Sequence, residues 1–121
     1  MLKTHKNLEA WKISRSLVKD IYLLTKKFPK EEIYGLTNQI RRSAISIPSN
    51  IAEGAARGGS KEFIRFLYFA LGSLSEIETQ IILSNDLAYL EEPMEILEKI
   101  ARIGRLLSGL IKNIKEKKPD E

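Results

Sequence analysis

The sequence predicts an all-α fold, an antiparallel up-down-up-down four-helix bundle, on three observations. Apolar residues recur every three or four positions through four long segments, no segment of useful length alternates apolar and polar residues, and every connection is short. A chain of 121 residues suffices for one core, so we expect a single domain over residues 1–121. The helices are expected at about 8–28, 31–57, 61–90 and 93–116.

The first expected helix has an apolar face and a charged face. Its core face comprises Ala10, Ile13, Leu17, Ile21, Leu24 and Phe28, and Pro29 ends the helix because the residue before a proline is pushed out of the α region. Nearly opposite lie five cations, which we call the basic face: Lys12, Arg15, Lys19, Lys26 and Lys30. Trp11 and Tyr22 border this face, where aromatic rings either pack in the core or stack on unpaired bases.

The second expected helix contains a proline in its middle. Its core face comprises Leu36, Ile40, Ala44, Ile47, Ile51 and Ala55, and Gly35 leaves open a start near Leu36. Pro48 removes one backbone donor and predicts a proline-kinked helix, the alternative being two shorter helices. A separate polar stripe is spaced for close contact with another helix and predicts part of an oligomer interface: Asn38, Arg42, Ser46, Ser49 and Glu53.

The third expected helix is apolar on two sides. One side is a core face of Phe63, Phe66, Leu67, Ala70, Leu71, Leu74, Ile77 and Ile81. The other side carries Phe69, Leu83, Leu87 and Leu90, with Gly72 among them. Since a helix with two apolar sides is normally covered on both, we expect a homo-oligomer in which a sister copy covers the second side. Coverage by a folded-over terminus remains the alternative.

The fourth expected helix follows Glu92 and Pro93, which suit a helix start. It buries Ile96, Ile100, Ile103, Leu107, Leu110 and Ile114. The preceding turn at 58–60 supplies glycines to stop the second helix and a serine to cap the third.

Catalytic chemistry finds little support in the residue inventory. The chain has no cysteine, its single histidine is His5, and the Glu-x-x-His pairs of di-metal bundles are absent. The stretch GAARGGSK, residues 54–61, nearly matches a phosphate-binding loop, but its Ser and Lys are inverted and a helical pattern precedes it instead of a strand. We therefore expect no enzyme, no metal, no cofactor and no small-molecule substrate.

Charge and hydropathy indicate the compartment and the class of partner. No signal peptide and no run of about 18 uncharged apolar residues occurs, which predicts a cytoplasmic protein without a membrane partner. Residues 1–30 carry eight Lys and Arg against two acids, whereas residues 58–92 carry two against six. The basic face therefore predicts phosphate contacts with RNA, with Arg41 and Arg42 as second-tier contacts. A merely solvated lysine face, and a protein-protein adaptor without nucleic-acid contact, remain open.

The runs QIRRSAISIPSNIAEG and KEFIRFLYFALGSLSE, within residues 28–90, together with the NLEAWK start, closely resemble the bacterial four-helix bundle family of 23S rRNA intervening-sequence proteins. That resemblance implies a closed ring of identical bundles, by analogy a homopentamer, without enzymatic activity. Relatives of the family include the accessory variability protein of diversity-generating retroelements, a similar ring that binds nucleic acid and a reverse transcriptase. We therefore expect a non-catalytic scaffold or binding protein that engages RNA, ribosomal RNA or another protein.

Overall fold

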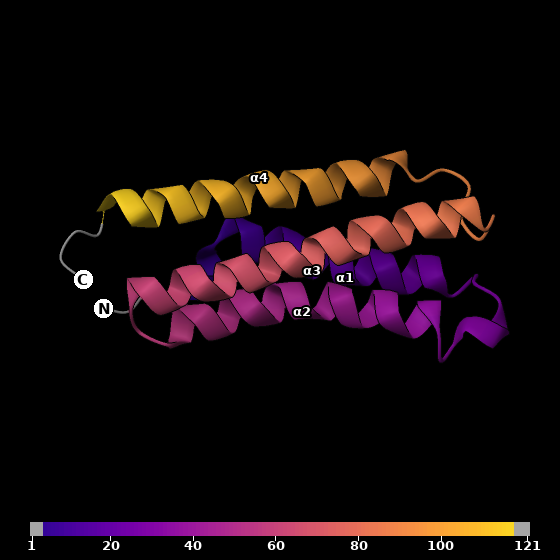
Figure 1. Ribbon diagram of the computed structural model, residues 1–121, viewed down its shortest axis with the longest axis horizontal. Helices are drawn as coiled ribbons and strands as arrows, with labels where there is room; N and C mark the ends of the chain where they lie inside the picture. The colour runs from indigo at the N-terminus through magenta and orange to yellow at the C-terminus, as the bar shows by residue number, and fades with distance from the viewer. Residues whose placement is uncertain (1–3, 118–121) are drawn as a thin grey trace.

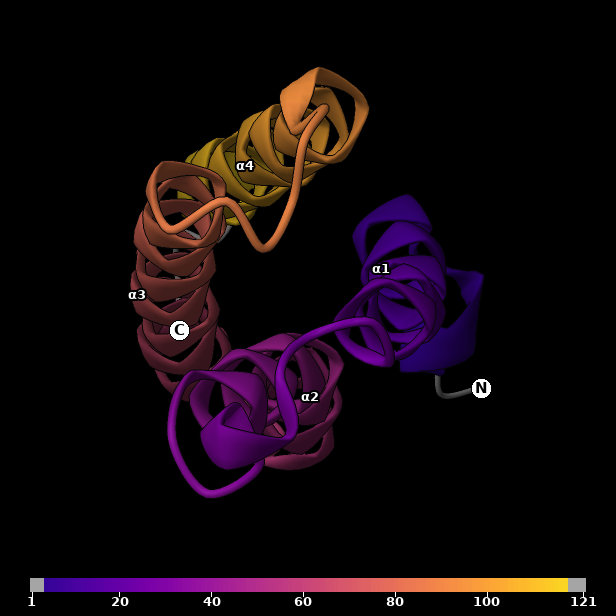
Figure 2. The same cartoon turned by 90° about the vertical axis from the view of Figure 1, so that its right-hand side faces the viewer.

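The computed structural model describes residues 4–117, which form four long helices and no strand. The helices are α1 (Glu9–Thr25), α2 (Leu36–Ala56), α3 (Ser60–Asp86) and α4 (Met94–Lys117), with short 3-10 turns η1 (His5–Asn7) and η2 (Lys30–Glu32). The predicted all-α four-helix fold is confirmed. Successive helices lie side by side and the chain reverses direction at each connection (Figure 1). Viewed end-on, α1, α2, α3 and α4 follow one another around the bundle (Figure 2).

The core consists of the apolar faces of all four helices. Each helix contributes fully enclosed aliphatic side chains, such as Leu17, Ile47, Ile77 and Ile103. Most predicted core positions are buried, and Ala55 is half-buried. Seven more are half-buried and pack against the core from its edge: Ile13, Leu24, Leu36, Phe63, Leu71, Leu110 and Ile114. Burial of each large aliphatic side chain contributes roughly 1.5–3 kcal/mol, so this cluster is the main source of stability.

Three predicted helix boundaries are wrong at the same end of the bundle, and one of them is the end of the third helix, which lies at Asp86 and not at residue 90. The first helix ends at Thr25 and not at residue 28, and its Thr25 hydroxyl donates to the Ile21 carbonyl within the last turn. The second begins at Leu36 and not at residue 31, the alternative that Gly35 had left open. There the Glu32 carboxylate accepts the backbone N–H of Leu36 at 3.0 Å and so caps the first turn of α2.

Pro48 lies inside one continuous helix, so the alternative of two shorter helices is wrong. As a proline it cannot donate to the carbonyl of Ala44. In the same turns the Ser46 hydroxyl donates to the Ser43 carbonyl at 2.9 Å, and the Asn50 amide donates to the Ser46 carbonyl at 2.8 Å. Polar side chains therefore bond to the backbone around the proline, although to carbonyls other than that of Ala44.

The closest helix pair is formed by α2 and α3. Gly54 allows this approach, since a Cβ placed on it would lie 2.6 Å from the Cβ of Phe66. By length and composition α3 is also apolar enough to cross a membrane, a property that it shares with many core helices of bundles. In the structure it packs between α2 and α4.

Candidate nucleic-acid interface

Four of the five basic-face residues lie on α1 or at its end, and all five are exposed. Lys12, Arg15 and Lys19 project from the middle of α1, and Lys26 is its C-terminal cap residue. Lys30 lies beyond Pro29 in η2, so the expectation that it continues the helical stripe is wrong, because α1 ends early. The basic face is therefore a helical row of four cations with a fifth on the following turn.

None of the basic-face cations lies within 4.0 Å of a carboxylate in residues 4–117. Five cations on the other helices do have carboxylate partners: Arg57, Arg65, Lys99, Arg102 and Arg105. The acids of α1, Glu9 and Asp20, pair with α4. The helix thus separates its acids, which face α4, from its unpaired cations, which face solvent.

The two bordering aromatic residues differ in their surroundings. The Trp11 ring packs edge-on against His5, with ring centroids 5.0 Å apart, and the Arg15 guanidinium lies 5.5 Å from its centroid. Tyr22 is covered by the Arg41 guanidinium, 4.5 Å from its ring centroid. An arginine thus lies over each ring. Tyr22 is 37% exposed beside Arg41, whereas Trp11 is half-buried and lines an open pocket.

The two second-tier arginines, Arg41 and Arg42, also differ in their surroundings. Arg41 stacks on Tyr22 and donates from Nε to the Thr25 hydroxyl at 2.9 Å, so it joins α2 to α1. Arg42 is exposed on the next position of α2. Of these two arginines, Arg42 is the one that is exposed and could contact RNA or another chain.

The predicted interface stripe of α2 lies beside Phe69 of α3. The Ser46 and Ser73 hydroxyls hydrogen-bond across the two helices at 2.5 Å. Residues four apart share a helix face, which places Phe69 one turn from Ser73 and beside the α2 stripe. Within that stripe Asn38, Arg42, Ser49 and Glu53 are exposed, and Glu53 pairs with Arg57. The hydrogen bond that Arg57 donates to the Glu53 carboxylate raises the pKa of Arg57.

Three of the four apolar residues predicted on the outer side of α3 are exposed in the single chain: Phe69 (45%), Leu83 (46%) and Leu87 (52%). Leu90 differs, because α3 ends at Asp86. Ala88 then adopts a positive φ of 65°, and the Asn85 amide donates to the Leu90 carbonyl at 2.8 Å. This turn directs Leu90 onto the core, so the prediction that it continues the outer stripe is wrong.

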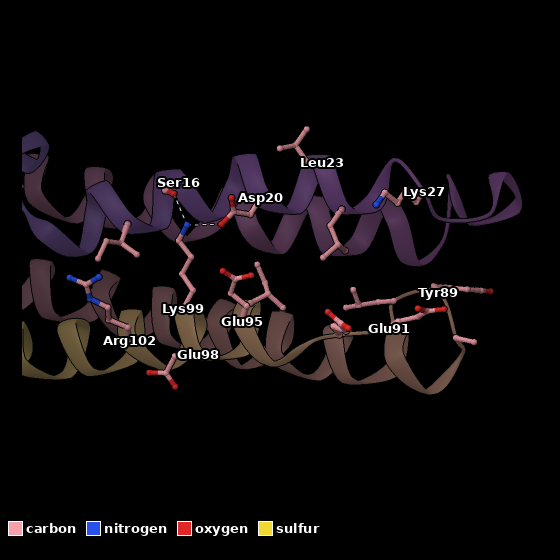
Figure 3. A pocket seen from close by; sticks show the side chains of 16 residues that line it. Ser16, Asp20, Leu23, Lys27, Tyr89, Glu91, Glu95, Glu98, Lys99 and Arg102 are labelled. Atoms are coloured by element: carbon pink, nitrogen blue, oxygen red, sulfur yellow. Dashed lines mark hydrogen bonds and ion pairs between the residues drawn. The ribbon is translucent and has the colours of Figure 1, made fainter.

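A groove of about 1300 Å³ between α1 and α4 has no counterpart in the sequence predictions (Figure 3). Lys99 crosses it, with its Nζ 2.6 Å from both the Ser16 hydroxyl and the Asp20 carboxylate. Apolar side chains and an excess of acids over cations line it, including Leu23, Leu24, Glu91 and Glu95. The acid-rich sequence of residues 58–92 was the available signal for part of this lining, but the pairing of α1 with α4 could not be inferred from it.

Tyr89, which lines this groove, is linked to a second ionisable group, Glu32. Tyr89 donates its hydroxyl to Glu32 at 2.9 Å, which raises the pKa of Tyr89. The pKa of Glu32 is lowered, first by the Leu36 N–H and then by Tyr89. Both shifts follow from hydrogen bonds that favour the carboxylate and the neutral phenol.

The near match to a phosphate-binding loop forms a connection between helices. Gly54 lies inside α2, Ser60 is the first residue of α3, and no strand precedes them in the described chain. Gly58 has a positive φ of 77°, as expected for the residue that ends a helix. Within residues 4–117 no group of three or more His, Asp or Glu is placed to hold a metal ion.

Comparison with known proteins adds one finding. A family model described as 23S rRNA-intervening sequence protein matches residues 6–109. This match covers most of η1, the first three long helices and most of α4. Among curated proteins, none matches the chain significantly.

Proposed function

The chain belongs to the family of 23S rRNA-intervening sequence proteins, and from this premise we propose that it is a non-catalytic cytoplasmic protein that assembles with copies of itself and binds RNA. RNA contact is assigned to the basic face of α1. The outer side of α2 and α3 is assigned to self-association, in a ring whose expected number of five subunits comes from the family resemblance. The non-catalytic part of the proposal rests on the presence of a single histidine and the lack of cysteine.

The observation that carries RNA binding is that none of the five basic-face cations has a carboxylate partner among residues 4–117. The family description names intervening sequences of 23S rRNA and does not say that the proteins bind RNA. Exposed cations in a row repel one another, and a polyanion relieves this repulsion while it releases its own condensed counterions. Paired cations, such as Arg57 with Glu53, would have to break an existing contact first.

The test is replacement of all five basic-face residues by glutamine, followed by titration of a labelled RNA at several salt concentrations. Each lost phosphate contact with a single strand lowers the slope of log affinity against log salt by about 0.7, so five lost contacts would lower it by about 3.5. Because the five side chains are exposed, the helical circular dichroism should be retained.

A matched control removes five other exposed cations: Lys61, Arg105, Lys112, Lys115 and Lys117. This variant has the same net charge and is expected to keep most of the RNA affinity. Equal losses in the two variants would show attraction by net charge alone and would contradict the assignment. No binding by the unchanged protein at low salt would reject RNA binding.

Self-association is supported by the exposed apolar residues on α3. Covering Phe69, Leu83 and Leu87 with a second copy would stabilise the assembly by removing large apolar side chains from water. The neighbouring α2 residues Ser49 and Glu53 are small or polar, which suits the border of such a contact.

Light scattering during gel filtration tests this part of the proposal. We expect an oligomer for the unchanged protein and a monomer for a Phe69→Lys, Leu83→Lys double variant with unchanged helical content. Met94→Lys, an equally apolar and more exposed site at the start of α4, serves as control and should leave the oligomer intact. A monomeric unchanged protein at micromolar concentration would reject self-association.

The adaptor alternative is favoured by one feature, the groove between α1 and α4. Its carboxylates, among them Glu91 and Glu95, disfavour RNA, whereas its apolar residues suit a protein ligand. If the protein is an adaptor, the five-glutamine variant keeps its cellular partner and Leu23→Lys in the groove loses it. The RNA proposal predicts the reverse, and purification of both variants from the source cells distinguishes them.

A further inference from the structure

A second, smaller pocket of about 380 Å³ opens beside the basic face, between α1 and α2. The wall from α2 consists of short or compact side chains, namely Pro48, Ser49 and Ala52, together with Ile45. These four residues are three or four positions apart and so lie on one face of α2. Because most of them are small, space remains between this face and the larger side chains of α1. The pocket therefore exists because α2 carries small residues where α1 carries its only tryptophan.

The opposite wall is aromatic. Trp11 is half-buried, with Val18 two turns farther along α1 and His5 packed edge-on against its ring. This packing holds the indole ring in position while part of it still borders the pocket. The pocket is shallow and open, and its volume of about 380 Å³ leaves room for a single planar heterocycle with one face against the indole ring.

The positive charge beside the pocket favours planar ligands that carry negative charge. Arg15 lines the pocket, and Lys12 and Lys19 lie within one turn of it on the same helix. All three are exposed and have no carboxylate partner in the described chain. An apolar slot next to a row of unpaired cations is complementary to an apolar base face attached to a phosphate backbone.

We propose that this pocket receives one unpaired base of RNA, which stacks on Trp11 while Arg15 and its neighbouring lysines contact the adjoining phosphates. This inference rests on the proposed RNA binding and specifies which part of the RNA is recognised. In a duplex the bases are stacked on each other and cannot enter a pocket, so the protein should prefer single-stranded segments or loops.

Tyr22 does not offer a second site of this kind. Tyr22 is 37% exposed, but its ring lies beneath the Arg41 guanidinium, which a hydrogen bond to Thr25 holds in place. The Arg15 guanidinium near the Trp11 ring has no such hydrogen bond among the described residues. The larger groove between α1 and α4 is lined by carboxylates and would repel the backbone that carries the base. At Trp11 an aromatic ring borders a pocket next to cations that have no carboxylate partner in the described residues.

Because Trp11 is the only tryptophan, its fluorescence reports on the pocket directly. A single-stranded RNA of 12 nucleotides and a blunt RNA duplex of equal length are titrated at the same ionic strength. We expect the single strand to quench the fluorescence and to bind about tenfold or more tightly than the duplex, as expected for one stacked base. The duplex should cause little quenching.

Two substitutions test the pocket without removing the basic face. Ala52→Leu fills the pocket but keeps Trp11 as a reporter, and it should abolish both the quenching and the preference for single strands. Ala56→Leu makes the same change at an exposed position one turn farther along α2 and should preserve both. Trp11→Leu, followed with a labelled RNA, should bind single strand and duplex equally while it retains the salt dependence.

The outcomes separate this inference from the proposal on which it rests. Salt-dependent binding with equal affinity for the two RNAs and no quenching would overturn the base pocket and leave the basic-face assignment in place. A change of Trp11 fluorescence on dilution, with none on RNA addition, would identify a second copy as the occupant and would also overturn it. Absence of binding to either RNA would reject the proposed function together with the inference.

Discussion

Tyr89 donates a hydrogen bond of 2.9 Å to the carboxylate of Glu32 and so joins the α3–α4 connection to the turn that precedes α2. The same tyrosine ring lies 5.4 Å from that of Phe28, at the end of the segment after α1. Glu32 in turn accepts the N–H of Leu36. The two connections at this end of the bundle, α1–α2 and α3–α4, are thus linked through the contacts of Tyr89 with Phe28 and Glu32.

Tyr89→Phe removes the hydroxyl and keeps the ring that packs on Phe28. We expect the pKa of Glu32 to rise toward the ordinary glutamate value but to remain below it, because the Leu36 N–H is the larger cause of the lowering. Carbon-13 NMR titration of the Glu32 carboxyl group measures this directly. Tyr34→Phe, at a far more exposed tyrosine, should not change the Glu32 pKa.

The lowered pKa of Glu32 also predicts the direction of a pH effect on stability. The folded chain binds this proton more weakly than the unfolded chain, so the contribution is fully present above the ordinary glutamate pKa and is lost as pH falls through the lowered value. The free energy of unfolding should therefore fall less steeply with decreasing pH in Glu32→Gln than in the unchanged protein. An acid limb identical to that of the unchanged protein would contradict the prediction.

Lys99 links α4 to α1 across the large groove (Figure 3). Its side chain is 28% exposed and that of Asp20 is 38% exposed, so solvent screens the pair only in part. We expect Lys99→Met to lower the free energy of unfolding by about 0.5–1 kcal/mol at low salt, and by less in 1 M salt. Urea denaturation at one fixed protein concentration measures both values.

The control for Lys99 is Arg105, whose bridge to Glu98 joins two residues of α4 and is more exposed. Arg105→Gln should change the free energy of unfolding by no more than a few tenths of a kcal/mol. A salt-independent loss in the Lys99 variant would indicate that its aliphatic stem, and not its charge, stabilises the contact between the helices.

Arg41 is expected to act in stability and not in RNA contact. Its stacking on Tyr22 and its bond to Thr25 join α2 to α1, and together they are worth about 1–2 kcal/mol. Arg41→Gln should lower the free energy of unfolding by that amount, with RNA affinity largely retained. Lys19→Gln, a basic-face variant, should show the opposite pattern, and the reverse result for either residue would contradict its assignment.

The periodic parts of the fold could be predicted from the sequence because helix packing repeats every three or four residues. Ile47 and Ile77, for example, are buried as their spacing indicates. Helix ends were less predictable, since Ala88 takes a left-handed conformation without being glycine, and Glu32 caps a helix from four residues away. Neither has a distinctive local pattern.

The candidate site, like the fold, could be predicted from the sequence only where it follows from helical spacing. The cationic row on α1 follows from helical spacing alone, but whether a cation is paired depends on which helix lies beside it. Arg41 and Arg42 are adjacent in sequence and differ completely in their contacts. The pocket at Trp11 forms because α2 packs alongside α1 in a register that places Pro48 and Ala52 opposite Trp11. This register depends on tertiary packing, which the sequence pattern does not show.

Gly54 was not distinguished from other small residues in the sequence, yet the structure makes it a strict requirement for the contact of α2 with α3. An added Cβ would lie 2.6 Å from the Phe66 Cβ, 3.1 Å from the Phe63 Cδ1 and 3.3 Å from the Phe63 carbonyl oxygen. The first of these atoms is next to the backbone and cannot rotate away. Relief therefore requires the two helices to separate, with loss of packing along the closest helix pair.

We accordingly expect Gly54→Ala to lower the free energy of unfolding by about 1–3 kcal/mol, although alanine favours the helix intrinsically. Gly109→Ala is the matched control, since it lies inside α4 with nothing within 4 Å of an added Cβ. At Gly109 only the greater helix propensity of alanine acts, and it should raise the free energy of unfolding by about 0.5–1 kcal/mol. Thermal or urea unfolding of the two variants should thus shift in opposite directions, and a stabilised Gly54→Ala protein would mean that α2 and α3 are not held as closely as the structure places them.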